Sequence, residues 1–122
     1  MPSILLVDDD ADTRSLMCEA LARRGFDVDT VDSAEACLER FETSPPTVVV
    51  TDVQMPGMSG IELCGRLHEL LPEIVVVVMS GLEDTATKRA AKVSGAFTFL
   101  HKPVSASALD MVLRDALHSV QR

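Results

Sequence analysis

Polar side chains able to act together on a phosphate group follow or end four short apolar runs of the sequence. They comprise an acidic cluster, a further carboxylate, a hydroxyl and an ammonium group, carried by Asp8, Asp9, Asp10, Asp52, Ser80 and Lys102. Carboxylates about 4 Å apart repel by roughly 4 kcal/mol at an effective dielectric near 20. Asp8, Asp9 and Asp52 therefore need a cation if they meet. Their hard oxygen ligands favour Mg²⁺, which binds carboxylates, waters and phosphate oxygens.

A cation, a lysine, a hydroxyl and a free carboxylate are the parts needed to transfer a phosphoryl group onto that carboxylate. Asp52 would be the in-line nucleophile, and Lys102 would pair with a phosphoryl oxygen as a point charge. Each part alone has an ordinary structural explanation, since acids after a strand also cap helices and Ser-Gly or Lys-Pro pairs also form turns. The combination favours a phosphoryl-transfer site.

The elements that must position these side chains alternate along the chain. Apolar runs predict strands at 4–7, 28–31, 48–50, 74–79 and 97–100. Three of these runs are apolar on both faces, which is typical of central parallel strands, whereas 28–31 alternates as an edge strand does. Helical stripes lie between the runs, so the order predicts an α/β fold with a doubly wound five-stranded parallel sheet. Ligands of such sheets bind beyond the carboxyl ends of the strands.

Four helical stripes are clear, and the helix near 84–94 is weaker. The first stripe contains Leu16, Met17, Ala20 and Leu21. In the weak helix we expect three apolar residues to face inward and three basic residues to face water, respectively Ala86, Ala90 and Val93, and Lys88, Arg89 and Lys92. His68 and His118 are expected at solvated helix positions.

Composition limits the function further. The 122 residues fit one domain, residues 1–122. A net charge of −8 makes direct binding to nucleic acid or an anionic membrane a poor prospect, and 3% aromatic residues leave little for base stacking or a flavin sandwich. Three cysteines without a CxxC pair indicate reduced thiols, and the sequence shows no signal peptide or membrane span, so we expect a cytoplasmic protein.

Four stretches together resemble a response-regulator receiver domain, the CheY-like module of two-component signalling. They are ILLVDDD at 4–10, DVQMPGMSG at 52–60, MSG at 79–81 and KP at 102–103. The resemblance covers the whole chain and implies the flavodoxin-like strand order 2-1-3-4-5, which the chemotaxis member exemplifies. It also implies a cis peptide bond between Lys102 and Pro103.

The resemblance implies a role for each matching residue. Asp52 matches the phosphoacceptor, and the metal positions correspond to Asp8, Asp9, Asp52 and the backbone carbonyl of Gln54. Lys102 matches the lysine that pairs with the phosphoryl group. Ser80 matches the hydroxyl that reports phosphorylation, and Phe99 the aromatic switch position, where tyrosine is frequent.

The implied activity is acceptance of a phosphoryl group from a sensor histidine kinase or phosphotransfer protein, with Mg²⁺, followed by a change in an output surface. That surface comprises the helix near 84–94, the strand at 97–100 and the closing helix at 109–120, and a homodimer could form through it. Residues 95–103 look most like receivers of NtrC-type transcription activators. Asp10 is a third acid, for which helix capping is favoured. His101, beside Lys102, could tune the site, although an ordinary surface role is favoured.

Three alternatives stay open at this point. A haloacid-dehalogenase-like aspartyl-phosphate phosphatase or mutase typically has a second acid two residues after its nucleophile, where this chain has Gln54. A degenerate receiver that only binds proteins would lack site residues that are present here. A flavodoxin would need a Ser/Thr-rich phosphate loop after the first strand. The resemblance implies a switch that assists its own phosphorylation and not a turnover enzyme.

Overall fold

A five-stranded parallel sheet forms the centre of the molecule. The computed structural model describes residues 3–82 and 84–120. The sheet has the order β2-β1-β3-β4-β5, as predicted, and every pairing is parallel. The strands are β1 (Ser3–Val7), β2 (Asp27–Val31), β3 (Val48–Asp52), β4 (Val75–Ser80) and β5 (Thr98–His101).

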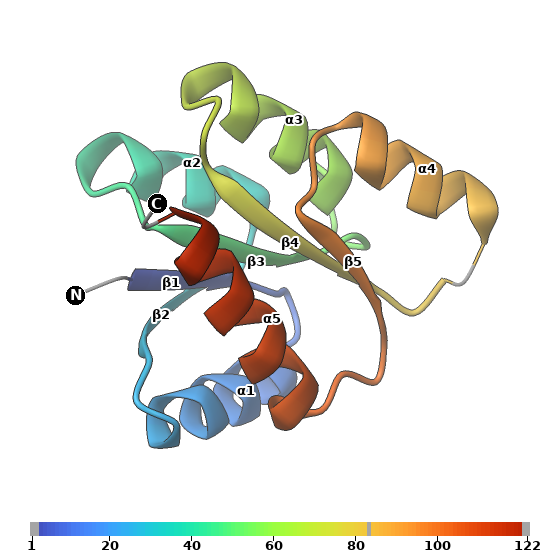
Figure 1. Ribbon diagram of the computed structural model, residues 1–122. Helices are drawn as coiled ribbons and strands as arrows, with labels where there is room; N and C mark the ends of the chain where they lie inside the picture. The colour runs from blue at the N-terminus through green and yellow to red at the C-terminus, as the bar shows by residue number, and fades with distance from the viewer. Residues whose placement is uncertain (1–2, 83, 121–122) are drawn as a thin grey trace.

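Helices cover both faces of this sheet (Figure 1). On one face lie α1 (Ala11–Arg23) and α5 (Ala106–Val120), and on the other lie α2 (Ala34–Thr43), α3 (Gly60–Leu70) and α4 (Thr85–Val93). The strand-to-helix order therefore repeats five times, which confirms the predicted doubly wound α/β fold. The loops that leave the carboxyl ends of β1, β3 and β5 lie at the same end of the molecule (Figure 1).

Two hydrophobic clusters hold the layers together, one on each face of the sheet. Alternating side chains of a strand point to opposite faces, so β3 contributes Val49 to the cluster under α2, α3 and α4, and Val48 and Val50 to the cluster under α1 and α5. All residues of β3 and β4 are buried, as their continuous apolar runs predict. The edge strand β2 has no buried residue and combines exposed with half-buried ones, which agrees with the edge position predicted for 28–31.

Short polar side chains cap the amino ends of α1, α2, α3 and α4. The side chains of Asp10, Ser33 and Asp84 accept hydrogen bonds from backbone amides in the first turns of α1, α2 and α4. Ser59 and Glu62 form a capping box at the start of α3. Such caps satisfy amide groups that have no partner within the helix.

The predicted inward face of α4 is wrong. Ala86 and Ala90 are exposed and Val93 is 82% exposed, whereas Ala91 is fully buried and half-buried Thr87 and Ser94 lie on its side of the helix. The prediction weighed apolarity alone. The hydroxyl of Ser94 donates to the Ala91 carbonyl at 2.7 Å, so a polar side chain can face inward with its hydrogen bond satisfied.

Two further side-chain placements differ from expectation. Leu16 is 69% exposed, because the buried side of α1 is set by Leu21 and half-buried Met17. His68 is half-buried and not solvated, with Nδ1 2.8 Å from the Cys64 carbonyl oxygen and Nε2 2.9 Å from the Ile74 carbonyl oxygen. His118 is exposed, as expected.

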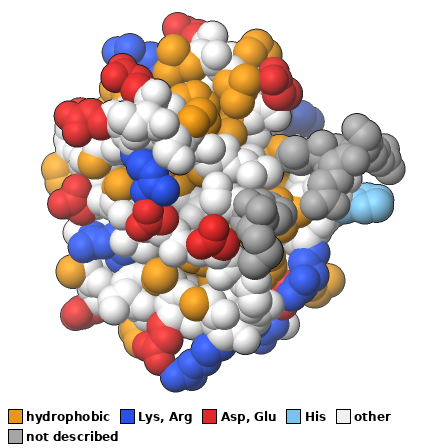
Figure 2. All heavy atoms as spheres, turned by 90° about the vertical axis from the view of Figure 1, so that its left-hand side faces the viewer, with side chains coloured by type: hydrophobic (Ala, Val, Ile, Leu, Met, Phe, Trp, Pro, Cys, Tyr) orange, Lys and Arg blue, Asp and Glu red, His pale blue; other side chains and the backbone are white. Residues whose placement is uncertain are grey.

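The surface at the amino ends of the strands mixes charge types. Figure 2 looks onto this end, opposite the loops that follow β1, β3 and β5, and shows acidic and basic side chains interspersed there. Among the described residues, no helix combines the length and apolarity needed to cross a bilayer.

The three thiols should differ sharply in reactivity. Cys37 and Cys64 are fully buried, and burial raises the pKa of Cys37 to about 12 and also raises that of Cys64, whereas Cys18 is half-buried. Because the thiolate is the reactive form, a maleimide should label Cys18 of the folded protein first. All three should react in denaturant. Rapid labelling of Cys37 in the folded state, located by peptide mass spectrometry, would contradict this packing.

Candidate functional site

Three carboxylates converge at the carboxyl end of the sheet. Oxygens of Asp8, Asp9 and Asp52 all lie within 4.8 Å of one another. Asp8 directly follows β1 and is 1% exposed, Asp52 ends β3 and is 7% exposed, and Asp9 is exposed. Adjacent parallel pairing of β1 with β3 brings together acids that are more than forty residues apart in the sequence.

Lys102 lies against two of these acids. Its Nζ is 2.9 Å from Asp52 Oδ2 and 3.4 Å from Asp8 Oδ2. Partial burial alone would lower the pKa of Lys102, but the hydrogen bond and charge of Asp52, with a further contribution from Asp8, raise it above its usual value. The ammonium group therefore stays charged and offsets part of the repulsion between the acids.

The backbone holds Lys102 at this edge. Its amide donates to the Ser80 carbonyl at 2.8 Å, which extends the β4–β5 pairing by one residue. The Lys102–Pro103 peptide bond is cis, as expected from the resemblance. His101, the last residue of β5, is exposed.

Asp10 caps α1, as predicted. Its carboxylate accepts from the Asp12 amide at 3.1 Å and from the Thr13 hydroxyl at 2.8 Å. The Thr13 bond, followed by the Asp12 bond, lowers the pKa of Asp10. The Asp10 amide in turn donates to Asp8 Oδ1 at 2.9 Å, so the cap also orients the neighbouring acid.

Ser80 is fully buried at the end of β4, beside the strand that carries Asp52. Its Oγ accepts from the amide of Leu82, at 2.9 Å, in the loop that leads to α4. Phe99 of β5 is half-buried and packs against the cluster under α2, α3 and α4. A pocket of about 230 Å³ between α4 and β5 is lined in part by Phe99, Ala91 and Lys88.

The loop after Asp52 folds back over it. The Gln54 amide approaches Asp52 Oδ1 at 3.4 Å, which places this part of the backbone beside the acid. The Gly60 amide donates to the Val53 carbonyl at 2.9 Å. A Cβ atom on Gly60 would lie 2.1 Å from the Asp52 carbonyl oxygen, so α3 begins in contact with the backbone of the acid.

Two further contacts at this edge match no motif of the sequence. Arg14 Nη1 donates to the backbone carbonyl of Asp8 at 2.8 Å. Glu35 of α2 lies over Gly57 and accepts from the Met58 amide at 3.4 Å. Both side chains are common types on exposed helix faces, and their spacing from the acids matches no motif. The one available signal was that Arg14 lies one helical turn after Asp10.

The donor set fits a small divalent cation. Three carboxylates offer hard oxygen ligands within a small volume, and one of them, Asp9, remains open to solvent. Mg²⁺ prefers one or two carboxylates and keeps several waters. Asp8, Asp9 and Asp52 are therefore suited to hold Mg²⁺.

Removal of one acid should stabilise the metal-free protein. Asp9 adds a negative charge beside Asp8 and Asp52, and no basic side chain is recorded within bonding distance of it among the described residues. Asp9→Asn should raise the free energy of unfolding in chelator by about 1 kcal/mol or more, because the repulsion of two charges near 4 Å is about 1 kcal/mol in water and larger beside buried groups. Asp52→Asn should stabilise less, because it also removes the Lys102 ion pair. Denaturant titrations give both values, and a loss of stability in Asp9→Asn would refute the repulsion.

The fold and the carboxyl end of the sheet together define a doubly wound α/β protein with an acidic site for a cation beside a lysine. Residues 4–114 match the family model for the response regulator receiver domain. The transcriptional regulator NtrC of Azospirillum brasilense is 33% identical over 117 residues, which are 96% of this chain and 24% of that protein. The response regulator FleR of Pseudomonas aeruginosa is 38% identical over 93% of this chain and 24% of its own length.

Solved structures agree. A response regulator receiver domain protein from Clostridium thermocellum superposes with a TM-score of 0.93 at 28% identity, over 99% of this chain and 98% of that one. NtrX from Brucella abortus gives a TM-score of 0.91 at 31% identity, over 99% of this chain and 28% of that one. This chain belongs to the response regulator receiver domain family. It spans about a quarter of the length of NtrC and FleR.

Proposed function

We propose that this receiver accepts a phosphoryl group on Asp52 from a sensor histidine kinase or phosphotransfer protein, with Mg²⁺ held by Asp8, Asp9, Asp52 and the Gln54 carbonyl. The observation that carries the proposal is the convergence of the three acids with Lys102, whose Nζ is 2.9 Å from Asp52 Oδ2. A phosphatase of the alternative class has a second acid at the position of Gln54, and a degenerate receiver would lack part of this set.

The transfer forms a bond between an Asp52 carboxylate oxygen and phosphorus. The phosphorus–nitrogen bond of the donor's phosphohistidine breaks, and the imidazole leaves with the electron pair. Lys102 neutralises the developing charge on a phosphoryl oxygen, and Asp8 and Asp9 hold the cation. When bound, Mg²⁺ supplies charge neutralisation and orients the phosphoryl oxygens.

Incubation with Mg²⁺ and an acyl phosphate, followed by intact mass measurement, tests this function. The wild-type protein should gain one phosphoryl group, and the gain should vanish when a chelator replaces Mg²⁺. Labelling that persists unchanged in chelator would contradict the cation-dependent reaction.

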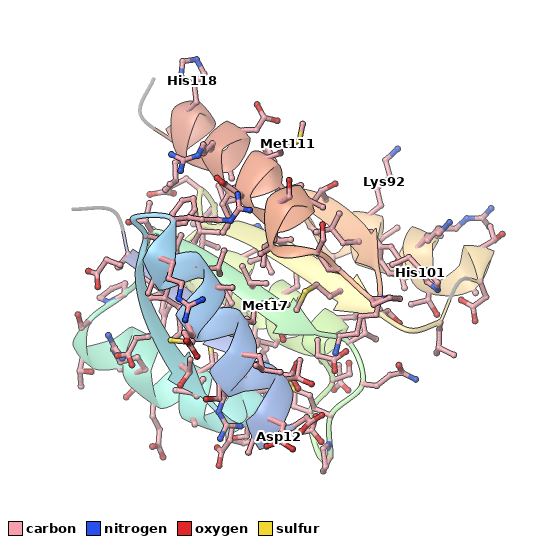
Figure 3. All side chains as sticks on the ribbon, turned by 90° about the horizontal axis from the view of Figure 1, so that it is seen from below. Asp12, Met17, Lys92, His101, Met111 and His118 are labelled. Atoms are coloured by element: carbon pink, nitrogen blue, oxygen red, sulfur yellow. The ribbon has the colours of Figure 1, made fainter. Side chains whose placement is uncertain are left out.

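The donor protein would approach along a groove beside Lys102. The groove has a volume of about 350 Å³ and is lined by Thr13 and Met17 of α1 and by Pro103 and Val104 after β5. It shares Thr13, Met17 and Val104 with a second hollow that extends to Leu16. Figure 3, which looks onto α1 and α5, shows Met17 on the side of α1 that faces α5. An exposed apolar strip next to the reacting group suits a helix of the donor.

Phosphorylation would reach the output surface through Ser80 and Phe99. The Ser80 hydroxyl bonds the Leu82 amide here. If the hydroxyl turns to a phosphoryl oxygen on Asp52, that bond to the loop before α4 is lost, and Phe99 moves inward to fill the space. Phe99 has no hydroxyl, so this coupling rests on packing. Since Ala91 is the only residue of α4 that is fully buried, the docking of α4 is easily shifted.

NMR shifts with and without a stable phosphoryl mimic test the relay. Perturbations should extend from Asp52 to Phe99 and to the basic residues of α4, Lys88, Arg89 and Lys92. Perturbations confined to the neighbourhood of Asp52, with the site saturated, would contradict it. Ser80→Ala should leave the mimic bound while shortening the reach of the perturbations.

The output surface comprises α4, β5 and α5. It combines the basic residues of α4 with exposed Val93 and Phe97. We propose that a homodimer forms through this surface. Met111 and His118 project from the outer side of α5 (Figure 3). The similarity to NtrC supports a receiver of the kind found in NtrC-type activators. Dimerisation that depends on the phosphoryl mimic, measured by sedimentation, would support this surface, and a monomer in both states would refute it.

A further inference from the structure

Every polar group of Asp8 has a specific partner. Its amide donates to the Val31 carbonyl at 3.3 Å, and its Oδ1 accepts from the Asp10 amide at 2.9 Å. Its Oδ2 lies 3.4 Å from Lys102 Nζ, and its carbonyl accepts from Arg14 Nη1 at 2.8 Å. The Arg14 bond is the shortest of the four, and because its donor is charged it is stronger than a bond between two neutral groups.

We propose that Arg14 is a positioning residue for Asp8, an inference that rests on the proposed Mg²⁺ site. Arg14 is half-buried on the first turns of α1 and reaches back six residues to the point where β1 ends. Its guanidinium fixes the orientation of the Asp8 peptide, and the carboxylate of Asp8 follows from that peptide. Among the described residues, the recorded hydrogen bond of the Arg14 side chain goes to the Asp8 backbone and not to a carboxylate of the site, so Arg14 would act on the cation through Asp8.

The sign of the effect separates positioning from simple electrostatics. Arg14 is a positive charge near a cation site, so its charge alone opposes Mg²⁺ binding. If charge were its whole influence, a neutral replacement would bind Mg²⁺ more tightly. If Arg14 positions Asp8, the same replacement binds Mg²⁺ more weakly, because a ligand that has lost its outer partner is less well ordered.

The test is a Mg²⁺ titration in which binding is measured by calorimetry and by NMR shifts of the backbone amides. It compares Arg14→Met, Arg14→Lys and a charge-matched control. Arg23→Met is that control, since Arg23 lies on the same helix but pairs with Glu19 on an exposed surface. Arg14→Met should bind Mg²⁺ about tenfold more weakly, within the range for outer-shell partners of metal ligands. Arg14→Lys retains the charge and one donor, so it should recover part of the affinity, and Arg23→Met should match the wild type.

A second readout needs no metal. In chelator, Arg14→Met should shift the carbonyl ¹³C resonance of Asp8 and the amide resonance of Asp9, whereas Arg23→Met should leave both in place. If Arg14→Met proves poorly folded, the same measurements are made on Arg14→Lys. Equal or tighter Mg²⁺ binding by Arg14→Met than by Arg23→Met would overturn the role of Arg14 while leaving the proposed function intact. Failure of the wild type to bind Mg²⁺ would overturn both.

Discussion

Replacing Gly60 by alanine should cost about 3 kcal/mol or more of folding stability, the upper end for inserting an atom into a packed interior. The added Cβ would lie 2.1 Å from the Asp52 carbonyl oxygen and 2.8 Å from the Asp52 carbonyl carbon. Both are backbone atoms at the end of a fully buried central strand, so neither can move cheaply. Relief of the clash must displace either α3 or the acid.

Gly65 provides the matched control, because it lies in the same helix and a Cβ there meets nothing within 4 Å. Gly65→Ala should therefore raise stability by up to about 1 kcal/mol, the difference in helix propensity between the two residues. Denaturant titration measures both variants. If Gly60→Ala is as stable as Gly65→Ala, the close approach of α3 to Asp52 is wrong.

Lys102→Met should slow phosphorylation by an acyl phosphate about 10²–10³-fold, the loss seen when one donor to a developing negative charge is removed. Among the described side chains, Lys102 forms ion pairs with both Asp52 and Asp8. The variant leaves these acids without that partner, so in chelator it should also unfold at lower denaturant concentration. Added Mg²⁺ should restore part of that stability.

Arg23→Met removes an equal charge from an exposed position and serves as the control for this rate. Its phosphorylation rate should equal that of the wild type. Rates come from intact mass spectra collected over time at saturating Mg²⁺. A rate for Lys102→Met within a few-fold of the control would show that Lys102 contributes little to the transfer.

Most of the sheet could be predicted from sequence because its strands are short, apolar and bounded by polar residues. The runs at 4–7 and 48–50 differ from β1 and β3 by one or two residues at their ends, and the run at 97–100 is displaced by one from β5. Parallel strands place their carboxyl ends at one edge of the sheet, and the strand order implied by the family resemblance puts β1 beside β3, so the two together predict the meeting of Asp8, Asp9 and Asp52.

The contacts that sequence could not predict depend on helix rotation and side-chain reach. α4 and its C-cap residue carry two stripes of the same spacing, one through Ala86, Ala90 and Val93 and one through Thr87, Ala91 and Ser94. Apolarity favours the first stripe, which is the wrong one. The bond from Arg14 to a backbone carbonyl leaves no trace in residue type, since any carbonyl can accept it. For Gly60, the sequence shows the glycine, but only the fold shows that the Asp52 backbone occupies the space of a side chain.

The most direct test of phosphoryl acceptance at Asp52 is intact mass and peptide mapping of the wild type and Asp52→Asn after incubation with Mg²⁺ and an acyl phosphate. The wild type should carry one phosphoryl group, located on the peptide that contains Asp52. Asp52→Asn should carry none, because its amide oxygen is a poor nucleophile. Labelling of Asp52→Asn to the wild-type extent, or a phosphoryl group mapped to another peptide of the wild type, would contradict the assignment of Asp52 as the acceptor.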